Sequence, residues 1–156
     1  AELERQLQTF EADLKGFHST RWKRNGLEWE AIGDRDRILC VRHELYNDSG
    51  KSAEAYFYKD GNVWAYRQWH HFADRPGSPP NHVQVGLLFF DERGQVLQNT
   101  ILEDHQIIRV TGLQAQRLGG NFRKDGQASL EDARKRLAGP MGSEQPGGLG
   151  TPTSGS

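Results

Sequence analysis

The stretch AYFYKDGNVW, residues 55–64, decides the fold that we predict from the sequence. Its centre, Asp60-Gly61, is favoured in two-residue turns between antiparallel strands, because both residues tolerate a positive φ angle. Aromatic residues on both sides of such a turn are typical of strands. We therefore predict a β-hairpin with strands at 53–58 and 63–72.

A second stretch, LFFDERGQV at residues 88–96, places aromatic, acidic and glycine residues in the same order. It predicts another hairpin, with strands at 83–90 and 95–102. Residues 73–81 link the two hairpins and contain Pro76, Gly77, Pro79 and Pro80, so we expect an exposed loop there. Two consecutive hairpins favour a meander in an antiparallel sheet.

The residues before the hairpins predict a helix, then further strands. Residues 2–17 repeat apolar side chains at helical spacing, namely Leu3, Leu7, Phe10, Leu14 and Phe17. We expect this amphipathic helix to cover the core, with a partner-binding helix as the alternative. Residues 27–31 and 38–45 predict strands, and the sequence NDSG at 47–50 predicts a turn.

After the hairpins the pattern is less regular. Residues 104–110 are compatible with either a strand or a helix. Residues 113–118 predict a helix that ends at Gly119-Gly120, and Ser129 is placed to cap a short helix at 130–138. Residues 139–156 are rich in glycine, proline and serine, which predicts a disordered tail.

Together these elements predict one α+β domain at residues 1–138. An N-terminal helix packs on a curved antiparallel sheet of roughly five to seven strands, and one or two short helices follow. Strong curvature would give a half-open cone or barrel with a pocket between helix and sheet.

Composition excludes several classes of protein. The net charge is −1 with both signs interspersed, which argues against a nucleic-acid surface. No apolar run approaches the length of a membrane span. The single cysteine, Cys40, excludes an internal disulfide and a cysteine-rich zinc site, and its apolar neighbours predict a buried thiol. No cofactor is predicted.

The two hairpin stretches, AYFYKDGNVW at 55–64 and LFFDERGQV at 88–96, resemble a group of small exported bacterial proteins of uncharacterised function, in which aromatic–acidic–Gly hairpins follow an N-terminal helix. The resemblance covers about residues 40–100 and implies export without assigning catalytic residues. The chain begins at Ala1, so we expect a mature form after removal of a signal peptide or a trimmed chain.

The first candidate site is an aromatic face of the sheet. Alternation along the strands would let tyrosines, a tryptophan and a histidine form a surface for a flat polar ligand or a peptide. The residues are Tyr56, Tyr58, Trp64, Tyr66 and His70. The alternative is that these aromatics pair across the strands as core. The leading hypothesis is a non-enzymatic, exported binding or interaction domain for an unknown small ligand or protein partner.

Two other functions remain open. An enzyme with a small pocket would use His43 or His70 as a base, with a carboxylate or hydroxyl within about 3 Å. An interaction scaffold would dock its partner on a sheet edge or on the 73–81 loop, with the tail as a tether. A metal site is disfavoured, because His70 and His71 point to opposite faces of a strand.

Overall fold

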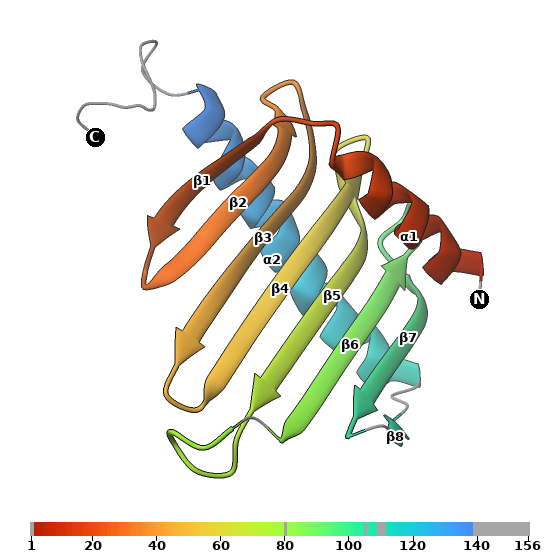
Figure 1. The fold of residues 1–156 in the computed structure, drawn as a ribbon. Helices are drawn as coiled ribbons and strands as arrows, with labels where there is room; N and C mark the ends of the chain where they lie inside the picture. Colours follow the sequence, from red (N-terminus) through yellow and green to blue (C-terminus); the bar gives the residue numbers. More distant parts are fainter. Residues whose placement is uncertain (1, 80, 105, 109–111, 139–156) are drawn as a thin grey trace.

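A computed structural model describes residues 2–79, 81–104, 106–108 and 112–138, so the predicted tail at 139–156 lies outside the described residues. Two helices lie on opposite faces of an antiparallel sheet (Figure 1). The elements in chain order are α1 (Glu2–Leu14), β1 (Ser19–Arg24), β2 (Leu27–Asp34), β3 (Arg37–Asn47), β4 (Gly50–Lys59), β5 (Asn62–Phe72), β6 (His82–Phe90), β7 (Val96–Glu103), β8 (Gln106–Ile108) and α2 (Gly112–Ala138).

The predicted α+β class and the meander of hairpins are confirmed. Each strand pairs with the next one along the chain, in the order β1 to β8, and β1 and β8 are the two edges of an open sheet. In the part of the chain that the structure describes, the sheet has eight strands rather than the predicted five to seven. In the segment 104–110, for which the sequence allowed a strand or a helix, residues 106–108 form a strand, and residues 105, 109 and 110 lie outside the described residues.

Residues with positive φ angles form the tight turns of two hairpins. Asp60 and Gly61 have φ angles of 52° and 78°, the left-handed pair that a tight hairpin turn requires. Asn25 and Gly26 have nearly the same geometry, with φ angles of 52° and 77°. They create the β1–β2 hairpin, so strand β1 is an addition to the predicted set.

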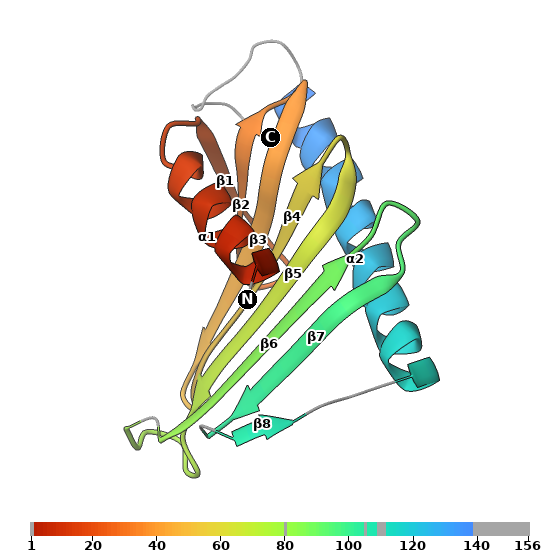
Figure 2. The ribbon, with the colours of Figure 1, turned by 90° about the vertical axis from the view of Figure 1, so that its right-hand side faces the viewer.

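Helix α1 packs on one face of the sheet through the predicted apolar stripe (Figure 2). Leu7 and Leu14 are buried, and Phe10 meets the rings of Phe57 and Trp64 edge-on. The helix ends at Leu14, three residues before the predicted end, and Phe17 is exposed.

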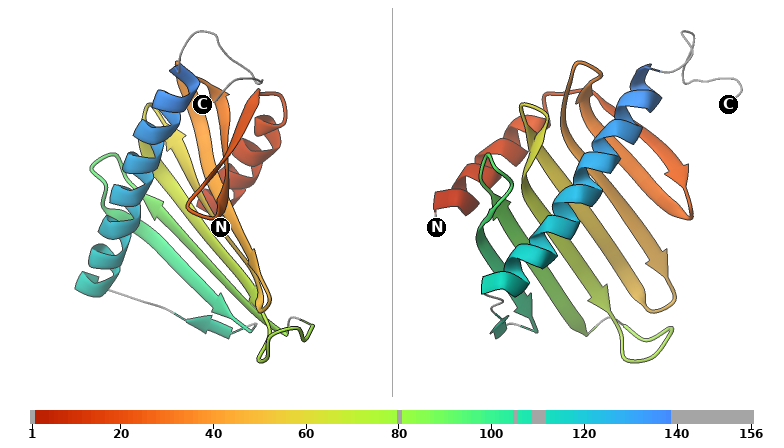
Figure 3. Two further views of the ribbon diagram at one scale, coloured as in Figure 1. Left: turned by 90° about the vertical axis from the view of Figure 1, so that its left-hand side faces the viewer. Right: turned by 180° about the vertical axis from the view of Figure 1, so that it is seen from behind.

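Helix α2 crosses the other face as one continuous helix (Figure 3), which corrects the prediction of one or two short C-terminal helices. Gly119 does not end the helix because it faces the sheet. A Cβ atom there would lie 2.2 Å from Cγ2 of Val96, and a Cβ on Gly126 would lie 2.7 Å from Cγ2 of Val63. The two glycines therefore allow the helix backbone to approach the sheet closely.

The sheet consequently has a core on each face. The core under α2 contains Ala31, Ile38, Val41, Tyr56, Tyr58, Val63, Tyr66, Leu88, Phe90, Leu130 and Ala133. The core under α1 contains Leu7, Leu14, Ile32, Leu39, Cys40, Ala55, Phe57, Trp64, Ala65 and Phe89. Each helix covers only part of its face of the sheet (Figures 1 and 3).

Candidate functional site

The structure separates the predicted aromatic set onto two faces. Tyr56, Tyr58 and Tyr66 lie under α2, whereas Trp64 lies under α1. The cause is an irregularity in the β4–β5 register, where Tyr58 pairs with Val63 and Phe57 pairs with Ala65. Trp64 is the extra residue between these pairs, and such a bulge reverses the alternation that we assumed.

These aromatic residues are core residues in the structure, with exposed fractions between 0 and 8%. The Tyr58 hydroxyl donates a hydrogen bond of 2.7 Å to the carbonyl oxygen of Gly126 in α2. The Tyr66 hydroxyl donates to Glu54, and the Tyr66 ring stacks on Phe122. The expectation of one exposed aromatic face is therefore corrected.

The histidines singled out for acid–base chemistry lie on the α2 side. Nε2 of His43 is 3.0 Å from Oε1 of Glu54, and the His43 ring packs on Trp29. His70 contacts Gln68 through Nε2, and its Nδ1 lies 2.8 Å from Oγ of Ser52. Both histidines thus have the polar neighbour that the enzyme hypothesis requires.

His82 ties the 73–81 loop to the end of β7. Its Nδ1 contacts Asp104 and its Nε2 contacts Asp74, and these two hydrogen bonds raise the pKa of His82 above its ordinary value. The two carboxylates meet opposite ring nitrogens, so the three groups do not converge on one ion. Among the described residues, no cluster of histidine, cysteine and acidic side chains is arranged to hold a metal.

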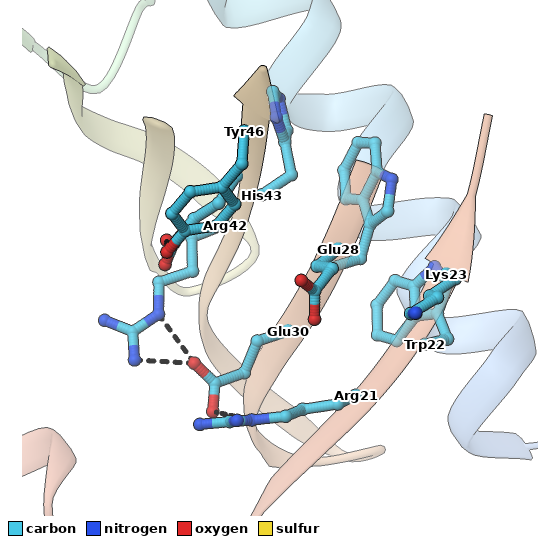
Figure 4. A pocket seen from close by; sticks show the side chains of 10 residues that line it. Arg21, Trp22, Lys23, Glu28, Glu30, Arg42, His43 and Tyr46 are labelled. Atoms are coloured by element: carbon cyan, nitrogen blue, oxygen red, sulfur yellow. Dashed lines mark hydrogen bonds and ion pairs between the residues drawn. The ribbon is translucent and has the colours of Figure 1, made fainter. Parts of the chain in front are cut away.

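Two hollows that could bind a ligand lie on the face of the sheet that carries α1, in the part that α1 does not cover. One, the β2 hollow, has a volume of about 390 Å³ and is shown in Figure 4. It is lined by Arg21, Trp22, Lys23, Glu28, Trp29, Glu30, Arg42, His43, Glu44 and Tyr46. The other, the β4 groove, has a volume of about 330 Å³ and is lined by Arg42, His43, Glu44, Lys51, Ala53, Glu54, Ala55, Arg67 and Trp69. The two hollows share Arg42, His43 and Glu44.

Two small side chains make the β4 groove. Ala55 lies between its register partners Arg42 and Arg67, and Ala53 lies between Glu44 and Trp69. Directly paired residues of neighbouring strands share a face, so the alanines form a floor with longer side chains on both sides. The result is a groove with a charged wall on β3 and a mixed wall on β5.

A nearly buried carboxylate organises the charged wall (Figure 4). Arg42 Nε donates to Oε1 of Glu30 at 2.6 Å, and Arg21 Nε donates to Oε2 at 3.2 Å. Burial raises the pKa of Glu30, but the hydrogen bonds and charges of Arg42 and Arg21 outweigh it and hold the pKa below its usual value. Two cations and one anion leave this triad with one net positive charge.

Each of the other two cations of the groove, Arg67 and Lys51, forms an ion pair with one glutamate. Arg67 Nη1 lies 2.6 Å from Oε1 of Glu11 in α1, and Lys51 Nζ lies 3.0 Å from Oε1 of Glu44. Lys51 also lies over the rings of Tyr46 and Trp69. The unmatched positive charge is therefore on the Arg42 side.

We expect Glu30→Gln to reduce the free energy of unfolding at neutral pH by about 1–3 kcal/mol, because two guanidinium groups lose a charged acceptor. The pKa of Glu30 is lowered in the folded state, so its stabilisation is complete above its ordinary value of 4.5 and is lost as the pH falls through the folded pKa. The difference between wild type and variant should therefore shrink in acid.

Urea denaturation of both proteins from about pH 7 to about pH 3 measures this difference. Glu28→Gln is the matched control, because Glu28 is exposed on the same strand and face. It should change stability at neutral pH by no more than about 0.5 kcal/mol. A Glu30→Gln difference that stays constant with pH would contradict the assigned role of the triad.

A larger hollow, of about 820 Å³, lies between the start of α1 and the two predicted hairpin turns. Trp64 lines it, and Lys59 Nζ lies 3.9 Å from the centre of the Trp64 ring. Many of its polar groups belong to exposed turns at 59–62 and 91–93. The β4 groove is instead built on strands, which hold side chains more precisely.

Sequence reasoning missed the β4 groove for a definite reason. Its floor and walls come from three strands, and only the register brings Ala53 and Ala55 opposite Arg42 and Arg67. A signal that could have found it is the alternation of Ala53 and Ala55 with Glu54 and Tyr56, which places two small side chains on one face of a strand. The predicted burial of Cys40 is confirmed, and burial raises its pKa to about 12.

Comparisons with protein-family models, with curated proteins and with solved structures find no match. Within the described residues, neither helix combines the length and the apolar character needed to cross a bilayer.

Proposed function

We propose that this chain is a non-enzymatic binding domain that takes its ligand in the β4 groove. The observation that carries the proposal is the floor of Ala53 and Ala55 between Arg42 and Trp69. A hollow with an apolar floor, an aromatic side chain in one wall and a few fixed charges is the usual form of a small-molecule site. Export remains part of the proposal and is supported by the hairpin resemblance.

Binding is favoured over acid–base catalysis by the placement of the histidines. His43 and Glu54 border the groove, but their side chains pair with Trp29 and Tyr66, which belong to the α2 side. Arg42 and Arg67 contact Glu30 and Glu11 on the α1 side. The candidate base and the strongest candidate anchor therefore lie on opposite faces of the sheet.

We expect Ala53→Leu to weaken ligand binding in the groove, because the larger side chain would occupy the space above the floor. Benzoate is a suitable probe, since it has an anionic group for Arg42 and a ring for Trp69. In ¹H–¹⁵N NMR titrations, benzoate should shift the amides of residues 53 and 55 and the Trp69 indole. Ala53→Leu should weaken this binding by at least tenfold.

The control is Ala12→Leu, the same substitution at an exposed position of α1. It should leave the benzoate titration unchanged, and circular dichroism should show both variants folded. Shifts that cluster away from the groove, or an Ala53→Leu variant that binds benzoate as the wild type does, would refute the proposed site.

A further inference from the structure

Strand β1 forms a free edge of the sheet. It pairs with β2 on one side, and none of the described helices or strands lies along its other side (Figure 1). The tight turn at Asn25-Gly26 makes Arg24 and Leu27 the first hydrogen-bonded pair of this hairpin. Hydrogen-bonded and non-hydrogen-bonded pairs then alternate along the two strands. The backbone N–H and C=O groups of every second residue of β1 therefore point away from β2, namely those of Lys23, Arg21 and Ser19.

These outward backbone groups are open to a further strand. Ser19, Arg21 and Lys23 are exposed, and within the described part of the chain no backbone hydrogen bond from another element reaches them. An extended segment that lies along such an edge continues the sheet by main-chain hydrogen bonds. The strand is six residues long, which is an ordinary length for strand pairing. The backbone of β1 can therefore hold a peptide, and the side chains decide which one.

The side chains of β1 carry positive charge only. Its sequence, STRWKR, has three cations and no acidic residue. Nε of Arg21 lies 3.2 Å from Oε2 of Glu30 on β2, and Arg24 pairs with an aspartate of α2, so neither acidic partner lies beyond the edge. Lys23 is opposite Glu28 in the register, but among the described residues no ion pair joins these two side chains. A strand added to the edge therefore meets cations first.

This charge disfavours a second copy of the chain as the partner. Antiparallel pairing of two β1 strands over most of their length would place Arg21 or Lys23 opposite a cation of the other strand. Like charges directly opposite each other destabilise a strand pair, whereas opposite charges stabilise it. Charged residues on edge strands commonly prevent such self-association. The same cations make an acidic strand the matching partner.

The two faces of β1 require different side chains from that partner. Arg21 and Lys23 are two residues apart, so both lie on the face that carries α1, where they line the β2 hollow (Figure 4). Trp22 lies on the opposite face, where its ring stacks on Trp29 and the Arg136 guanidinium is 5.2 Å from the ring centre. Successive side chains of an added strand alternate between the same two faces. Acidic residues beside Arg21 and Lys23 would thus alternate with apolar residues beside Trp22.

We infer that the free edge of β1 binds an extended segment of another protein in which acidic and apolar residues alternate. The segment continues the sheet through the backbone groups of Ser19, Arg21 and Lys23. Its carboxylates pair with Arg21 and Lys23, and its apolar side chains pack beside Trp22. This interaction goes beyond the proposed function, because it uses neither the floor of the β4 groove nor Arg42.

The test uses three peptides of equal length and the wild-type protein. The first is an acetylated and amidated peptide of seven residues in which glutamate alternates with valine. The second has lysine in place of glutamate, and the third is the first peptide methylated on the backbone nitrogen of each glutamate. Methylation keeps the charge but blocks strand pairing, because the glutamates opposite Arg21 and Lys23 are the residues that exchange hydrogen bonds with β1.

The glutamate peptide should change the NMR signals of the β1 edge. In ¹H–¹⁵N spectra it should shift the amides of Ser19, Arg21 and Lys23 and slow their hydrogen exchange. The amides of Thr20 and Trp22 are the internal reference, because they already bond to β2. The lysine peptide and the methylated peptide should each bind about tenfold more weakly or worse.

Two substitutions at one position separate charge from backbone pairing. Lys23→Gln removes only a charge and should weaken binding of the glutamate peptide about twofold to fivefold. Lys23→Pro also removes an outward N–H that β2 does not use, and should weaken binding about tenfold or more. Lys124→Gln, at an exposed position of α2, is the matched charge control and should leave binding unchanged. Circular dichroism checks that the variants fold, and the methylated peptide provides the same backbone test without a substitution.

The outcomes distinguish this inference from its alternatives. Equal binding of the glutamate and lysine peptides, or of the glutamate and methylated peptides, would overturn it. A concentration-dependent dimer of the free protein that Lys23→Pro dissociates would also overturn it, because the occupant of the edge would then be a second copy. Lys23→Pro should bind benzoate as the wild type does. Failure of benzoate to bind in the β4 groove would refute the proposed function and leave the edge inference standing.

Discussion

Tyr66→Ala is expected to lower the free energy of unfolding by about 3–5 kcal/mol, the range for removal of a large buried aromatic side chain. Tyr66 has no exposed surface, and its ring lies between Tyr56 and Phe122 at centroid distances of 5.2 and 4.3 Å. Its hydroxyl also donates to Glu54, so the variant loses a packed ring and leaves that carboxylate with one partner fewer.

The measurement is urea denaturation followed by circular dichroism, with Tyr46→Ala as the matched control. Tyr46 is a tyrosine in the same sheet, but it is 58% exposed. Its replacement should cost about 1 kcal/mol or less, because its contacts with Glu44 and Lys51 are at the surface. Equal losses for the two variants would contradict the placement of Tyr66 under α2.

Gly119→Ala is expected to destabilise the protein by about 1–3 kcal/mol through overpacking, although alanine is the better helix former. The added methyl group would lie 2.2 Å from Val96 Cγ2 and 3.2 Å from Cε1 of Phe90. Both contacts lie beneath the helix, so α2 must lift from the sheet or the core must rearrange.

The neighbouring Gly120 provides a control, because its replacement by alanine should change stability in the opposite direction. Gly120 is exposed, and no heavy atom lies within 4 Å of a Cβ built on it. Gly120→Ala should therefore stabilise the protein by up to about 1 kcal/mol, because alanine favours the helix interior. Thermal unfolding of the two variants should move in opposite directions. A shift of both in the same direction would mean that α2 does not approach the sheet as described.

The same two glycines show what sequence reasoning could and could not provide. The hairpin turns depend on a few adjacent residues, so Asp60-Gly61 and Asp91–Gly94 were sufficient to predict four strands. Gly119-Gly120 has an equally strong local preference, which led to a predicted helix end. The preference is overridden by contacts of Gly119 with Val96 and Phe90, residues more than twenty positions earlier in the chain.

The candidate site depended even more on distant residues. Strict alternation along 53–72 put Trp64 on the face of Tyr66, and the bulge between Phe57 and Tyr58 invalidates that assignment. One extra residue therefore decides which helix covers Trp64. The β4 groove depends on the register of three strands, which no single stretch of sequence encodes.

The order of the strands also has a consequence for how the chain folds. Every strand pairs with its immediate predecessor or successor, so the sheet can grow one hairpin at a time with short closing loops. Docking of α2 is different, since the bond from Tyr58 to Gly126 joins residues 68 positions apart. We therefore expect the sheet to form first, with the apolar face that α2 covers still exposed to water. Docking of α2 then buries that face and completes the native state.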